Sequence, residues 1–187
     1  MSARRFAALA LVVLIAACAA IPRAPRDLQP FDLLGRVAVT YTGGAVTANL
    51  RWEHLPEEDR IWLMTPTGQT LAFIVDSADG ATLTRADQQQ YRAASVEALT
   101  RQALGWALPL SLLQYWVKGE PAPGIPVTAV ERGPDGKLMA VTQSGWKAAV
   151  TYYAEGEMSG RVRRVDLSDG PNQIRLVIDT WRAAIEP

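Results

Sequence analysis

The chain has 187 residues, 49% of them hydrophobic, and this length fits one domain with a core of its own. Its 19 basic and 19 acidic side chains balance at pH 7, which argues against a nucleic-acid-binding protein, because a phosphate backbone requires a basic surface. One histidine and one cysteine leave little material for a metal site or a catalytic triad, so we expect no metal and no cofactor.

Residues 1–17 have the order of parts of a secretory signal peptide. Arg4 and Arg5 supply a positive start, and the apolar stretch Phe6–Ala17 follows. That stretch is shorter than the roughly 20 residues of a membrane-spanning helix, which favours removal. Residues 15–18, Ile-Ala-Ala-Cys, resemble the lipobox of bacterial lipoproteins, with Ile where Leu is usual. The resemblance implies that Cys18 becomes a lipidated first residue; the alternative is an ordinary signal peptide with an incidental cysteine.

Residues 18–30 are expected to form the lipidated N-terminus and a flexible tether. The segment 19–30 contains three prolines and no apolar periodicity, which is typical of an extended linker. The pattern changes at Phe31, so we expect the domain to cover residues 31–187.

Strict alternation marks residues 46–53, where Val46, Ala48, Leu50 and Trp52 share one side. This pattern predicts a half-buried β-strand. Similar runs occur at residues 36–41, 60–65, 70–76, 81–85, 89–93, 127–132, 137–143, 146–153, 161–167 and 173–181. Glycine, proline and aspartate turn signals separate them, so we expect a large antiparallel meander of about eleven strands.

His54 follows one of these runs and precedes the turn sequence Pro56-Glu57-Glu58-Asp59. We therefore expect a solvated turn histidine rather than a catalytic base. No nucleophile, base and orienting group stand out together in the sequence, so we expect no catalytic site and no enzyme.

Two short helices interrupt the strands. Residues 95–104 begin with Ser95 as an N-cap, carry apolar residues at helical spacing and stop at Gly105. Residues 109–117 predict a second helix, with Leu112, Leu113 and Trp116 on one face.

The small size of the two helices relative to the sheet predicts a cavity under a helical lid. An apolar sheet face must be covered, and two helices of about 15 Å each are too small to fill the concave side of so large a sheet. The alternative is a packed barrel or sandwich whose core is filled by large side chains. The residues concerned are Leu50, Trp52, Leu63, Phe73, Leu113, Trp116, Trp146 and Tyr152.

Six blocks carry a family resemblance: FDLLGRVAV, ANLRWEH, TPTGQTLA, LPLSLLQYWVKGEP, TQSGWKAAVTYY and IRLVIDTWR. In this order after a lipobox, they resemble the LolB family of outer-membrane lipoprotein receptors, from about Phe31 to Arg182. The resemblance implies a mainly β fold, a single antiparallel unclosed β-barrel with a short α-helical lid over an apolar cavity. It also implies a lipid-anchored monomer in the outer membrane, facing the periplasm, which takes lipoproteins from the periplasmic carrier LolA and inserts them into the inner leaflet of that membrane.

The implied cavity would hold the acyl chains of the cargo. The candidate lining residues are Leu50, Trp52, Leu63, Phe73, Leu99, Leu113, Trp116, Trp146 and Tyr152.

The loop Pro66-Thr67-Gly68 departs from the family, which commonly places an apolar residue between the proline and the glycine. Such a residue suits contact with the membrane. Met64 or Leu71 could provide that contact instead, or the loop could be a plain β-turn, for which proline and glycine suffice.

A second function class is a lipid-anchored structural or assembly factor that binds a protein through its sheet surface. It would have a filled core and would take up no lipid, whereas lipid transfer requires a cavity that can open.

Overall fold

The computed structural model describes residues 23–27 and 29–182; the expected signal peptide and Cys18 lie outside this part of the chain. Its strands are β1 (Phe31–Tyr41), β2 (Gly44–His54), β3 (Glu58–Met64), β4 (Thr70–Ser77), β5 (Gly80–Arg85), β6 (Gln90–Ala93), β7 (Val127–Arg132), β8 (Leu138–Gln143), β9 (Trp146–Tyr152), β10 (Val162–Ser168) and β11 (Gln173–Arg182). The helices are α1 (Val96–Leu104) and α2 (Leu110–Trp116). The mainly β class and the helical lid are confirmed.

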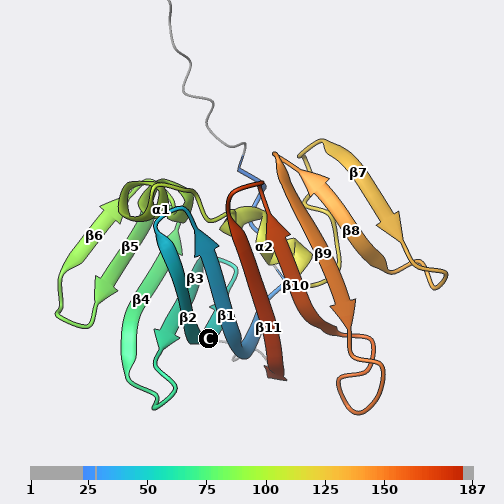
Figure 1. The fold of residues 1–187 in the computed structure, drawn as a ribbon, viewed down its shortest axis with the longest axis horizontal. Coiled ribbons are helices and arrows are strands. Elements are labelled where there is room, and N and C mark those ends of the chain that lie inside the picture. Colours follow the sequence, from blue (N-terminus) through green and yellow to red (C-terminus); the bar gives the residue numbers. More distant parts are fainter. Residues whose placement is uncertain (1–22, 28, 183–187) are drawn as a thin grey trace, which may run out of the picture.

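All eleven strands form one antiparallel sheet in the order β6-β5-β4-β3-β2-β1-β11-β10-β9-β8-β7. The expectation of one continuous meander is wrong at a single point, because β1 pairs with β11 and thereby joins two meanders. Strands β6 and β7 end up at opposite edges, so the barrel is unclosed (Figure 1).

Gly35 lies at the junction between the two meanders, where the register of β1 against β11 shifts. A Cβ atom at Gly35 would lie 2.2 Å from the carbonyl oxygen of Val177, so the close approach of the strands requires glycine.

Both helices have the termini that the sequence predicts. The Ser95 Oγ accepts the Ala98 N–H at 3.2 Å, and Gly105 ends α1 with a φ of 80°. Helix α2 follows Pro109, and its Ser111 N–H donates to the Glu97 carboxylate of α1 at 3.0 Å. An acidic side chain of one helix therefore caps the other and fixes the pair.

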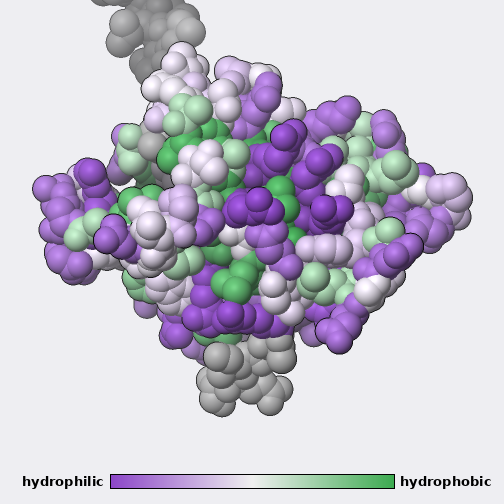
Figure 2. Space-filling view, turned by 60° about the horizontal axis from the view of Figure 1, so that its bottom comes forward, coloured by the Kyte–Doolittle hydropathy of each residue, from purple (hydrophilic) through white to green (hydrophobic). Residues whose placement is uncertain are grey.

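The core lies between the helices and one face of the sheet. On β1, β2 and β11, every second residue points to this inner face, as the alternation predicts. Figure 2 shows hydrophilic side chains over much of the face in view, with smaller hydrophobic patches among them. Within residues 23–27 and 29–182, neither helix is long and apolar enough to cross a membrane.

Residues 23–27 differ from the flexible tether expected for residues 18–30. Ala24 and Asp27 are buried, and the segment is hydrogen-bonded to β2, β3, β4 and α2. The Arg26 side chain and the backbone N–H and carbonyl of Asp27 make these bonds, and neither leaves an apolar periodicity in the sequence, so the composition is that of a linker.

Candidate functional site

An apolar cavity of about 160 Å³ lies between the helices and the first half of the sheet, β1–β6, here also called the cavity half; apolar atoms form the surface of the cavity. Its wall consists of Val37, Val39, Tyr41, Val46, Ala48, Leu50, Trp52, Ile61, Leu63, Ile74, Leu83, Thr100, Trp106, Leu108, Leu110, Leu113, Ile174 and Leu176. Six strands supply the sheet side, and α1, α2 and their connection supply the other side.

The cavity reaches the surface beside Val46, which lines it and is nevertheless 49% exposed. Strand β3 pairs with β2 only from Asn49 onward, so the first residues of β2 project beyond the neighbouring strand. This end of β2 therefore forms the rim of the cavity.

Four of the nine candidate lining residues lie in the cavity wall: Leu50, Trp52, Leu63 and Leu113. Leu99, Trp116 and Trp146 are buried in the core outside the wall. The indole N–H of Trp116 donates to the Gln143 side-chain oxygen at 3.1 Å, which holds this ring against β8.

Phe73 and Tyr152 also lie outside the wall. Phe73 stacks on Trp62 with ring centroids 4.9 Å apart, on the face of the sheet opposite to its neighbour Ile74, which lines the cavity. The Tyr152 hydroxyl donates to the Leu138 carbonyl at 2.8 Å, in the other half of the molecule.

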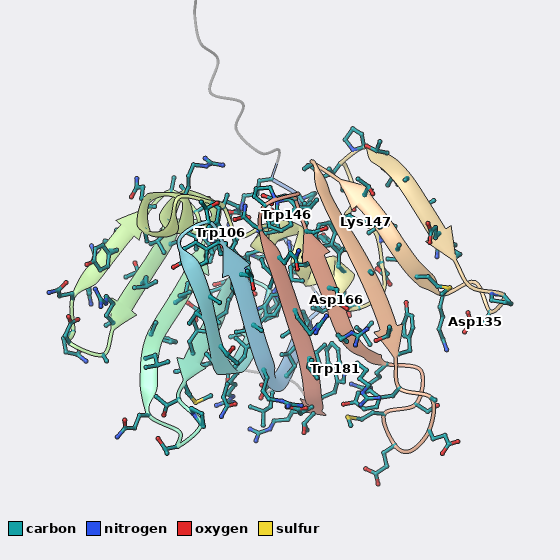
Figure 3. All side chains as sticks on the ribbon, in the orientation of Figure 1. Trp106, Asp135, Trp146, Lys147, Asp166 and Trp181 are labelled. Carbon is teal, nitrogen blue, oxygen red and sulfur yellow. The ribbon has the colours of Figure 1, made fainter. Side chains whose placement is uncertain are left out.

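Trp106 is the largest wall residue that sequence reasoning missed. It belongs to the irregular connection between the helices, where no periodicity identifies it. Its ring centroid lies 6.4 Å from that of Trp146 (Figure 3). The ring centroid of Tyr41 lies 6.3 Å away. Wall residues on strands, such as Val37 and Ile174, can be predicted from the period-two alternation of their strands.

His54 is fully buried, so the expectation of a solvated histidine is wrong. It continues the inward-facing series of β2 and stacks on Phe31 with centroids 4.8 Å apart. Its Nδ1 lies 2.7 Å from the Asp59 carboxylate and its Nε2 lies 2.6 Å from the Asp27 carbonyl. A carbonyl oxygen only accepts, so Nε2 carries a proton and donates it.

Asp59 and Asp76 are buried near His54, at one end of β3 and β4. Burial raises the pKa of Asp76 to about 6, although the nearby Arg23 and Arg26 favour its charged form. Asp59 accepts from Arg26 at 2.6 Å. This charged cluster lies outside the apolar wall of the cavity.

The loop Pro66-Thr67-Gly68 connects β3 to β4 and is exposed. The Gly68 N–H donates to the Thr65 carbonyl at 2.9 Å, and Gly68 has a φ of 86°. The hydroxyls of Thr65 and Thr67 are hydrogen-bonded at 2.8 Å. These bonds make the loop a tight turn, and Leu71, just beyond it, is 42% exposed.

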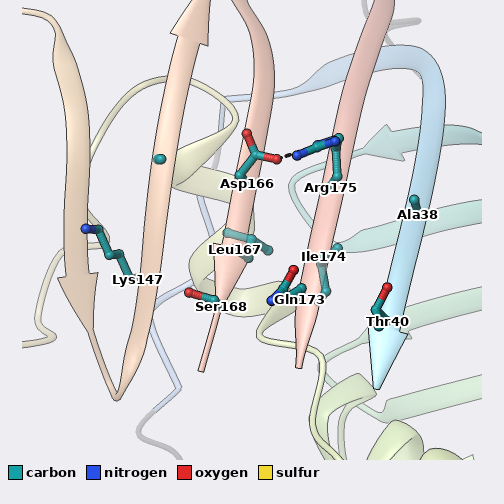
Figure 4. A pocket seen from close by; sticks show the side chains of 10 residues that line it. Ala38, Thr40, Lys147, Asp166, Leu167, Ser168, Gln173, Ile174 and Arg175 are labelled. Atoms are coloured by element: carbon teal, nitrogen blue, oxygen red, sulfur yellow. Dashed lines mark hydrogen bonds and ion pairs between the residues drawn. The ribbon is translucent and has the colours of Figure 1, made fainter. Parts of the chain in front are cut away.

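A second hollow, of about 400 Å³, lies on the face of the sheet away from the helices (Figure 4). Polar and apolar residues both line it, and Arg175 donates to Asp166 at 2.6 Å. Exposed ion pairs of this kind contribute little stability. Among the described residues, no group of histidine, cysteine, aspartate and glutamate side chains is arranged to hold a metal ion.

The chain matches the family model described as "Outer membrane lipoprotein LolB" over residues 29–181. Proteins named outer-membrane lipoprotein LolB from Chromobacterium violaceum and Azoarcus sp. are 35% and 34% identical to it; each alignment covers 96% of this chain, and 99% and 96% of those proteins. A LolA superfamily protein from Nitrosomonas europaea has a similar structure, with a TM-score of 0.51 over 88% of this chain and 90% of that one, at 10% identity. At this identity, the structural likeness concerns the fold alone.

Proposed function

Because the chain belongs to the LolB family of outer-membrane lipoproteins, we propose that it accepts lipoproteins by binding their acyl chains in the cavity and inserts them into the outer membrane. The observation that carries the proposal is the wholly apolar wall of this cavity. Sheltering an acyl chain from water gains about 0.8 kcal/mol per methylene, so such a wall is sufficient for binding. Transfer of this kind requires no catalysis.

The cavity is narrow in this structure. Its volume of about 160 Å³ is close to that of an apolar cavity of about 150 Å³ that holds one benzene molecule. A long acyl chain needs more room, so one wall must move. The strands are joined by hydrogen bonds along their length, which leaves the helical wall with Trp106, Leu110 and Leu113 as the side that opens.

The proposal places the protein as a monomer on the periplasmic side of the outer membrane, anchored through a lipid on Cys18. The carrier LolA delivers the cargo, and no energy source is required if each step runs downhill. The receptor then holds the acyl chains more tightly than the carrier does and less tightly than the bilayer does.

Transfer from carrier to receptor tests this function. A soluble Cys18→Ala chain is mixed with LolA loaded with a radiolabelled lipoprotein, and the receptor-bound label is measured. We expect acceptance by this chain, and its loss when Leu113→Glu is added, because a carboxylate in the apolar wall costs several kcal/mol unless it finds a partner.

Leu71→Glu is the matched control, because Leu71 is exposed and outside the wall. It should accept cargo normally. Normal acceptance by a folded Leu113→Glu chain would contradict the cavity as the lipid site and favour a factor that binds proteins through its sheet surface.

A further inference from the structure

The segment 23–27, here called the strap, is bonded to helix α2. The Gln114 side chain holds it at two points: its Oε1 accepts the Asp27 N–H at 3.0 Å, and its Nε2 donates to the Pro25 carbonyl at 3.0 Å. The Tyr115 hydroxyl donates to the same carbonyl at 3.0 Å. Backbone groups of the strap are therefore paired with side chains of a helix that forms part of the cavity wall.

The strap is equally bonded to the sheet. Arg26 donates to the Asp59 carboxylate at 2.6 Å and to the Asp76 carbonyl at 2.9 Å, and Arg23 donates to the Asp76 carboxylate at 2.5 Å. Both carboxylates are buried, so losing the arginines would remove the cationic partners of buried charges, which is costly. These bonds attach the strap firmly to one end of β3 and β4.

The strap thus connects α2 to strands of the cavity half. Two further hydrogen bonds of α2 go elsewhere: the Ser111 backbone N–H donates to the Glu97 carboxylate of α1, and the Trp116 indole N–H donates to the Gln143 side chain of β8. Leu110 and Leu113 of the same helix line the cavity. When the strap leaves, α2 loses its connection to β3 and β4 and keeps the hydrogen bonds to α1 and β8, so the side of the helix over the cavity is less restrained.

We propose that the strap is a latch: while docked it holds α2 closed over the cavity, and when it undocks α2 can move and admit a ligand. This inference rests on the proposed use of the cavity for acyl chains and adds a control over access to it. Access to the cavity then depends on whether the N-terminal segment is docked on the domain.

The length of the chain ties the latch to the proposed anchor. From Cys18 to Arg23, an extended chain reaches at most about 18 Å, and from Cys18 to Phe31 about 45 Å, at roughly 3.5 Å per residue. With the strap docked, a lipid-anchored domain stays close to the bilayer with its cavity closed. Undocking both lengthens the tether and frees α2, so the reach of the domain and access to its cavity change together.

The experiment compares Arg26→Gln with the matched control Arg175→Gln in the Cys18→Ala chain. Arg26→Gln breaks the ion pair of the strap with Asp59, and Arg175→Gln breaks the exposed ion pair with Asp166 on the outer face. Amide hydrogen exchange in α2 and in β9–β11 is measured, together with the association rate of a dansyl-labelled undecanoic acid, followed by energy transfer from tryptophan.

Arg26→Gln should raise the amide exchange rate in α2 and the association rate of the fatty acid about fivefold or more, as expected for the loss of one hydrogen-bonded contact. The amide exchange rates in β9–β11 should not change. Arg175→Gln should match the parent chain. Tyr115→Phe, which removes one bond to the strap and keeps the ring, should shift both measurements in the same direction by a smaller factor.

Unchanged α2 exchange in both Arg26→Gln and Tyr115→Phe would overturn the latch. If Arg26→Gln unfolds globally, amide exchange in β9–β11 will rise as well, and the result for Tyr115→Phe then decides whether the strap holds α2. If the parent chain binds no fatty acid, the proposed function fails, and α2 exchange still decides whether the strap holds the helix.

Discussion

Both halves of the sheet have the same alternation of apolar and polar residues, but the interior is packed in one half and hollow in the other. In the second half, Trp116, Val117, Leu138, Val141 and Val165 belong to the hydrophobic core, and all five residues are at most 1% exposed. In the first half, the inner face borders the cavity, and residues such as Leu63 and Leu83 are only partly buried. Alternation therefore selects the inner face of a strand, and the place where the helices lie decides whether that face is packed or hollow.

Truncating one large side chain in each half should expose this difference most strongly. Trp116→Ala removes a fully buried ring and its bond to Gln143, so we expect a loss of about 3–5 kcal/mol in the free energy of unfolding. Leu63→Ala truncates a smaller side chain that is only partly buried, so it should cost about 2 kcal/mol, the low end for a leucine truncation. Urea unfolding measures both, and a loss for Leu63→Ala as large as that for Trp116→Ala would contradict loose packing in the first half.

The sequence predicts the elements of both halves because their signals are local. The alternation of residues 46–53 and the Ser95 and Gly105 caps each lie within a few residues of what they specify. The β1–β11 pairing joins opposite ends of the domain, and no local pattern encodes it. His54 lies at a strand end, where the alternation of β2 indicates a buried side chain and the following turn sequence indicates an exposed one; the alternation is the correct signal.

The cavity wall is harder to predict than the fold. Strand β4 carries apolar residues on both faces, with Phe73 outside and Ile74 inside, so alternation alone does not identify the inner face. Trp106 reaches the wall from an irregular connection, and Trp116 is drawn away from it by Gln143 on β8. Such positions depend on contacts between distant segments, which one sequence does not display.

The difference between the two halves can also be tested through charge, because the cavity half contains the buried carboxylate of Asp76. Its pKa is raised to about 6, so its contribution to stability is fully present below the ordinary value of about 4 and is lost as the pH rises through 6. Arg23, Arg26, Asp59 and Glu97 are the charged groups that act on it. We expect Asp76→Asn to remove this dependence, worth at most about 3 kcal/mol at roughly 1.4 kcal/mol per pKa unit.

The measurement is the free energy of unfolding between pH 4 and pH 7, taken as the difference between Asp76→Asn and the parent chain. The difference should change across this range in favour of the variant as the pH rises. Asp79→Asn, an exposed neighbour in the following turn, should follow the parent chain. A constant difference for Asp76→Asn would show that this carboxyl keeps an ordinary pKa.

The smallest expected effect concerns Thr67, at the tip of the exposed loop between β3 and β4. Thr67→Leu loses one exposed hydrogen bond to Thr65 and should leave the fold intact, because the backbone bond from Gly68 still closes the turn. If the loop meets the bilayer, an added leucine contributes up to roughly 1.5–3 kcal/mol on full insertion and speeds release of cargo into liposomes. Acceptance from the carrier should be unchanged, since Thr67 is outside the cavity wall.

The matched control for this loop is Thr151→Leu, which adds the same side chain at an exposed position of β9 in the packed half. Acceptance and release are scored separately on the Cys18→Ala chain, with vesicle association measured by flotation. Faster release by Thr67→Leu alone assigns membrane contact to the loop of the cavity half. Equal behaviour of the two variants would instead leave Pro66-Thr67-Gly68 as a turn that joins two strands, because a leucine that contacts lipid cannot be neutral in vesicle association.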